Sequence, residues 1–148
     1  MTKHLPYDLA RRLYDAGLRL STDRGYLLGS DNLPEANALT GEVILYATSV
    51  SVRGYYGEKV VSAPDTDELL SALPKTILTE QKRTWVLCLT INRNQFNAHY
   101  QYWQGGRLGS IYASESESPC VALGTLLLKL IEQGIVSVEE LNKAKQTT

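Results

Sequence analysis

TWVLCLTI at residues 84–91 and FNAHYQYW at residues 96–103 are the two stretches that decide the fold. In both, apolar and polar side chains alternate with period two, which is typical of β-strands with one buried face. A glycine pair, Gly105-Gly106, follows the second stretch and suits a tight hairpin turn. The sequence therefore predicts a β-meander of three consecutive antiparallel strands at residues 83–91, 96–104 and 107–113, with residues 77–79 as a candidate fourth.

The same alternation assigns the two faces of this sheet. The inward face is predicted to carry the large apolar side chains Trp85, Leu87, Leu89, Ile91, Phe96, Ala98, Tyr100 and Tyr102. The outward face then carries Asn97, His99, Gln101 and Trp103, with Cys88 on the neighbouring strand. Because side chains alternate between faces, a register slip of one residue would exchange the two sets.

A helix over residues 119–133 is the second decisive element. Ser118 is a good N-cap, Pro119 suits the first turn, and Gly134 suits the end. Apolar residues cover most of its circumference, so we expect it to be buried on most sides, across the inner face of the sheet. The predicted class is α+β: an antiparallel β-meander sheet packed against a largely buried C-terminal helix, with further short helices.

Shorter elements complete the predicted domain. Residues 6–16 have the apolar spacing of an amphipathic helix, and Asp65 with Glu68 predicts a capping box for a short helix that ends before Pro74. Residues 43–52 and 59–63 are strand candidates, which we interpret as a hairpin with two tyrosines at its tip. A last short helix is predicted to begin at Ser137. No long linker divides residues 1–148, so we expect a single α+β domain.

Composition excludes several classes of protein. The net charge of −1 gives no overall attraction to nucleic acid, which makes a nucleic-acid partner unlikely, although residues 75–107 are basic and residues 31–74 acidic. No apolar run is long enough for a membrane span, and the first residues do not form a signal peptide. Cys88 and Cys120, the two cysteines, are predicted to be free thiols in a reducing cytoplasm.

Catalytic and metal-binding motifs are missing from the sequence. The two histidines and two cysteines form no metal-ligand spacing, and no nucleophile or phosphate-binding motif is present. Asp65, Asp67 and Glu68 form the densest acidic group, which helix capping explains. Cys88 and His99 could share the outward face, but sheet packing explains both more simply. We predict no catalytic residue, no metal and no cofactor.

Tyrosine is the feature that points to binding. Nine tyrosines and two tryptophans stand against one phenylalanine, and such amphipathic rings suit ligand and partner surfaces. Six residues could stack on a flat ring and bind its edges or phosphates, namely Arg53, Tyr55, Tyr56, His99, Gln101 and Trp103. The alternative is that these residues only form the solvated face of a sheet.

Three stretches, residues 6–17, 63–74 and 116–134, resemble small uncharacterised proteins encoded by phages and prophages. The resemblance implies an accessory protein in the cytoplasm of a bacterial host cell. The favoured hypothesis is a non-enzymatic binding protein that captures a small nucleotide-like ligand or a host protein. The alternatives are a homodimerising protein-interaction domain and, third, an enzyme that acts through carboxylates.

Overall fold

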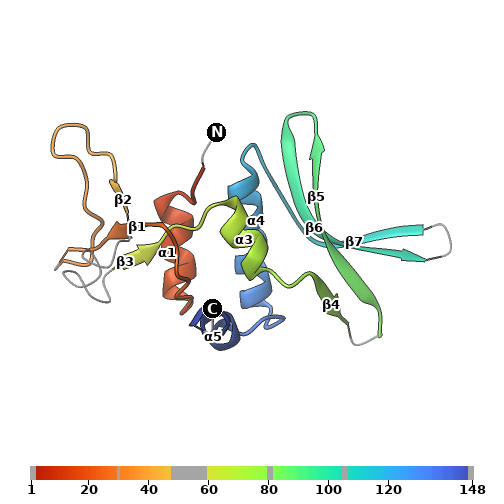
Figure 1. Cartoon of the computed structure of the whole chain (residues 1–148). Helices are drawn as coiled ribbons and strands as arrows, with labels where there is room; N and C mark the ends of the chain where they lie inside the picture. The colour runs from red at the N-terminus through yellow and green to blue at the C-terminus, as the bar shows by residue number, and fades with distance from the viewer. Residues whose placement is uncertain (1–2, 30, 48–59, 80–81, 105–106, 147–148) are drawn as a thin grey trace.

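The computed structural model describes residues 3–29, 31–47, 60–79, 82–104 and 107–146. Helices α1, α3 and α4 lie between two antiparallel sheets, with α5 packed at one end (Figure 1). The predicted α+β class is confirmed. The elements in chain order are α1 (Tyr7–Asp15), β1 (Arg24–Leu27), β2 (Leu45–Ala47), β3 (Val60–Ser62), α3 (Thr66–Ala72), β4 (Thr76–Leu78), β5 (Thr84–Asn92), β6 (Gln95–Gln104), β7 (Arg107–Ser116), α4 (Pro119–Glu132) and α5 (Val138–Gln146).

The larger sheet is the predicted meander, including its fourth strand. Its order is β4-β5-β6-β7, and every pair is antiparallel. Ala98 and Tyr100 are fully buried and Trp85 is 8% exposed, as the alternation predicted. The Tyr100 hydroxyl donates to the Pro74 carbonyl at 2.6 Å, so the ring is buried with its polar end bonded. The register that the sequence predicted is therefore correct.

One inward assignment in this sheet is wrong. Ile91 is 70% exposed, and Leu87 and Leu89 are only half-buried. All three lie on β5, whereas α4 packs mainly on β6 and β7. The inward side chains of β5 are therefore less buried than those of β6, and Ile91, near the β5–β6 turn, is exposed.

Helix α4 is the centre of the core, as predicted. The Ser118 hydroxyl caps it by accepting from the Val121 N–H at 3.4 Å. The helix contacts β6 and β7 on one side and α1 and α3 on the other. One hydrophobic cluster joins it to both sheets. The buried residues of α4 are Cys120, Ala122, Leu123, Gly124, Leu126, Leu127, Leu128 and Leu130.

The smaller sheet corrects the predicted hairpin of residues 43–52 and 59–63. Its order is β2-β1-β3, so the described strands of those two stretches, β2 and β3, pair with β1 and not with each other. Strand β1 takes the centre because its residues Tyr26 and Leu27 are buried. The Tyr26 hydroxyl also donates to the Leu5 carbonyl at 2.6 Å, which ties this sheet to the segment before α1. In the described part of the chain, no helix is long and apolar enough to cross a membrane.

Candidate functional site

A groove of about 460 Å³ lies where the beginning of β5 meets the end of β6. The turn that leads into β5 is closed by two backbone bonds, from Thr79 N–H to the Arg83 carbonyl and from Lys82 N–H to the Thr79 carbonyl. Lys82 adopts a left-handed φ of 60° there. The turn thus brings two cations to the start of the strand. The groove is lined by Lys82, Arg83, Thr84, Val86, Cys88, Gln101 and Tyr102.

Charge and aromaticity combine at one end of this groove. The Arg83 guanidinium lies 5.1 Å from the centre of the Tyr102 ring, within cation–π range. On the core side, the Tyr102 ring lies 5.3 Å from that of Trp85. Both Lys82 and Arg83 are exposed, and the lining residues that the structure describes include no acidic side chain. The groove therefore offers positive charge beside an aromatic ring that packing holds in place.

The middle of the groove carries hydrogen-bonding groups. The Cys88 thiol donates to Gln101 Oε1 at 3.3 Å, across the β5–β6 pair. Because the Gln101 carbonyl accepts this bond, the N–H groups of the same amide are the donors that Gln101 can offer to a ligand. Val86 is 49% exposed beside them and supplies apolar surface. These groups can bind the edge and the face of a flat polar ring.

The structure brings only part of the predicted site into this groove. Gln101 lines it, as expected, but His99 is 4% exposed and cannot reach a ligand in solvent. His99 lies in an inner strand, between Cys88 of β5 and a bulge where the β6–β7 register shifts. Trp103 pairs with Leu108 in the sheet, and its side chain lies outside the described residues. The other predicted residues, Arg53, Tyr55 and Tyr56, also lie outside them.

Six of the seven lining residues were not among the predicted ligand-binding residues. Lys82 and Arg83 belong to the basic segment at residues 75–107, which is the signal that could have located them. Tyr102 was assigned to the core, yet the residue is half-buried and also contributes to the lining of the groove. Cys88 was considered only as a partner for His99. The two do lie opposite each other in register, but the thiol donates to Gln101, and His99 Nδ1 has no hydrogen-bond partner among the described residues.

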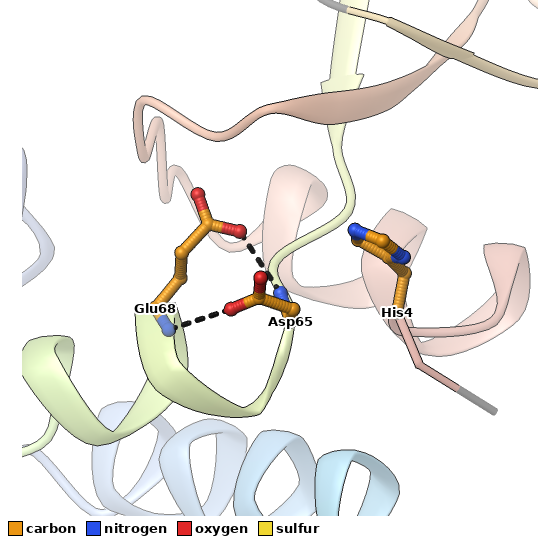
Figure 2. Close-up of side chains that lie close together, drawn as sticks. All are labelled: His4, Asp65 and Glu68. Atoms are coloured by element: carbon orange, nitrogen blue, oxygen red, sulfur yellow. Dashed lines mark hydrogen bonds between the residues drawn. The ribbon is translucent and has the colours of Figure 1, made fainter. Parts of the chain in front are cut away.

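A second group of polar side chains, His4, Asp65 and Glu68, lies at the start of α3 (Figure 2). One potential ligand atom from each lies within 4.8 Å of the others. Asp65 and Glu68 form the predicted capping box: Glu68 N–H donates to Asp65 Oδ1 at 2.8 Å, and Asp65 N–H donates to Glu68 Oε1 at 3.0 Å. Glu68 Oε2 accepts a further bond from Asp23 N–H. Burial raises the pKa of the Glu68 carboxyl.

Helix capping accounts for both carboxylates in that group. Their oxygens serve backbone N–H groups, and the positive end of the helix dipole opposes a cation at the same place. The groove between β5 and β6 has no such structural explanation for its cations. It is therefore the candidate site.

Comparison with protein-family models, curated proteins and solved structures found no significant match to this chain. The resemblance of residues 6–17, 63–74 and 116–134 to phage proteins stays a prediction.

Proposed function

We propose that this chain is a non-enzymatic binding protein that captures a small, anionic, nucleotide-like ligand in the β5–β6 groove. The observation that carries the proposal is the Arg83 guanidinium, 5.1 Å from the centre of the Tyr102 ring and beside Lys82, in a groove whose described lining residues include no acidic side chain. The cations suit a phosphate, and the Gln101 amide suits the polar edge of a planar base. A volume of about 460 Å³ falls within the usual range for small-molecule sites.

The resemblance to phage-encoded proteins supplies the proposed context. An accessory protein of a phage or prophage would act in the cytoplasm of its bacterial host, where nucleotides are abundant anionic ligands. A carboxylate-dependent enzyme has less support, because Asp65 and Glu68 are engaged in capping α3.

Thermal shift against a defined panel tests this function. The panel contains ATP, GTP and cyclic di-GMP. Adenosine, which has the base without the phosphate, and inorganic phosphate, which has the charge without the base, are included as fragments. A ligand at 100 times its Kd adds about 2.7 kcal/mol, which raises the Tm of a chain this size by roughly 5–10 °C. We expect a nucleotide to do so and both fragments to bind more weakly. If no nucleotide raises the Tm, the proposal is wrong.

Matched variants then locate the site. The double variant Lys82→Ala/Arg83→Ala should weaken nucleotide binding at least tenfold in calorimetry, because it removes both cations of the groove. Arg24→Ala removes an exposed cation at the start of β1, in the other sheet, and should leave the affinity unchanged. Equal losses from the two variants would show that binding is nonspecific charge attraction.

A further inference from the structure

Strand β4 is an edge of the larger sheet in the part of the chain that the structure describes (Figure 1). Some of its backbone N–H and C=O groups face away from that sheet. Leu87 N–H donates to the Lys75 carbonyl, and Thr79 N–H donates to the Arg83 carbonyl. In an antiparallel ladder the bonding residues alternate, so Ile77 also faces β5 while Thr76 and Leu78 point their N–H and C=O groups outward. The edge therefore presents two consecutive outward-bonding positions to another strand.

A groove of about 430 Å³ runs beside this edge, between β4 and the start of α5. Its walls include Leu78, which is 70% exposed, and Ile135, which is 42% exposed. Ile77, Val136 and Leu141 add further apolar surface. An extended strand in this groove would pair with β4 on one side and cover these side chains on the other.

Charge narrows the identity of that strand. Glu140 is the one charged residue among the described residues that line the groove, and exposed Glu139 precedes it in the first turn of α5. A matching strand therefore needs apolar residues with a cation next to them. Strand β4 itself has this pattern, because exposed Lys75 comes directly before Thr76-Ile77-Leu78.

We propose that a second copy of this chain occupies the groove, with the two β4 strands paired antiparallel about a twofold axis. Thr76 of one copy bonds to Leu78 of the partner subunit, and the two Ile77 residues meet at the axis. The same surface serves both copies, as a twofold interface requires. Each Lys75 approaches Glu140 of the partner subunit, and the two sheets become one continuous sheet.

Sedimentation velocity from about 1 μM to 1 mM protein tests this pairing. We expect a monomer–dimer equilibrium for the wild type. Thr76→Pro removes an N–H that β5 does not use, and Leu78→Lys places a charge on the edge, so each should weaken dimerisation at least tenfold. Thr90→Lys adds the same charge to an exposed position of β5 away from that edge and should leave the dimer intact. Circular dichroism checks that each variant is folded.

A charge exchange tests the Lys75 to Glu140 contact separately. Lys75→Glu and Glu140→Lys should each weaken the dimer, and the double variant should restore most of the loss. A wild type that stays monomeric at 1 mM overturns the proposal. So does a dimer that Leu78→Lys and Thr90→Lys affect equally, since the interface would then lie elsewhere.

Discussion

Gly124 of α4 packs against Leu5 so closely that a methyl group at position 124 would lie 2.5 Å from Leu5 Cδ2. It would also lie 3.1 Å from Leu9 Cδ2. Both leucines are buried, with exposures of 0% and 8%. The missing side chain thus allows the segment around α1 to approach the central helix.

This contact predicts that Gly124→Ala destabilises the protein although alanine favours a helix. Overpacking costs about 1–3 kcal/mol, and the helix gains about 1 kcal/mol, so we expect a net loss of up to about 2 kcal/mol. Urea denaturation measures it. In a double-mutant cycle with Leu5→Ala, which makes room for the methyl group, the two losses should be less than additive. Additive losses would mean that the two residues do not interact.

Leu127→Ala should lower the free energy of unfolding by about 2–5 kcal/mol, because Leu127 is fully buried in α4. Lys129 on the polar side of the helix is a matched control. Its Nζ donates to the Ala113 carbonyl at 2.5 Å, at an exposed position, so Lys129→Ala should cost at most about 1 kcal/mol. Equal losses in urea denaturation would contradict the orientation of α4.

The two cysteines should differ sharply in reactivity. Burial raises the pKa of Cys120 to about 12, and the nearby charges of Asp65 and Glu68 add to the effect. Cys88 is half-buried and lines the β5–β6 groove. We therefore expect Ellman's reagent at pH 8 to modify one thiol per folded chain, and two in guanidinium. Cys88→Ser should remove the fast reaction, whereas rapid labelling of Cys120 would contradict its burial.

The same thiol reports on ligand binding. A nucleotide that occupies the groove should slow modification of Cys88, and it should do so less in the Lys82→Ala/Arg83→Ala variant. Protection that persists in this variant would place the ligand at another site.

Glu68 should make stability depend on pH in a defined direction. Its pKa in the folded protein is raised, chiefly by burial, so the protonated carboxyl favours folding. This stabilisation by the protonated carboxyl is fully present below the pKa of the unfolded chain, about 4.3. It is lost as the pH rises through the pKa of the folded protein. The stability of the wild type relative to Glu68→Gln should therefore fall as the pH rises above about 4. Asp67→Asn, which changes an exposed acid of the same turn, is the control. If the stability of the wild type relative to Glu68→Gln rises with pH instead, the buried environment of Glu68 is contradicted.

Local signals in the sequence predicted most elements correctly. The Asp65 and Glu68 capping box, the Ser118 cap and the alternation around Tyr100 each depend on neighbours in the chain. The order β2-β1-β3 depends on pairing between distant segments, and turn signals near residues 54–57 suggested a hairpin instead. Non-local pairing leaves no short-range pattern from which it could be predicted.

The site was predicted less well for a related reason. Alternation places Gln101 and His99 on one face, but it does not reveal the register shift beside His99, which depends on β7. Nor does it show that the turn before β5 brings Lys82 and Arg83 to the end of β6. The contact between Arg83 and Tyr102 depends on this tertiary arrangement of the turn and β6.

The position of α4 between the two sheets also has a consequence during protein synthesis. Residues 119–132 follow every strand in the chain, yet they supply the buried surface on which both sheets depend. A nascent chain that has reached only Ser116 contains all the strands but lacks the helix that covers Tyr100 and contacts α1. Cooperative folding on the ribosome is therefore expected to begin only after Leu130 has left the exit tunnel.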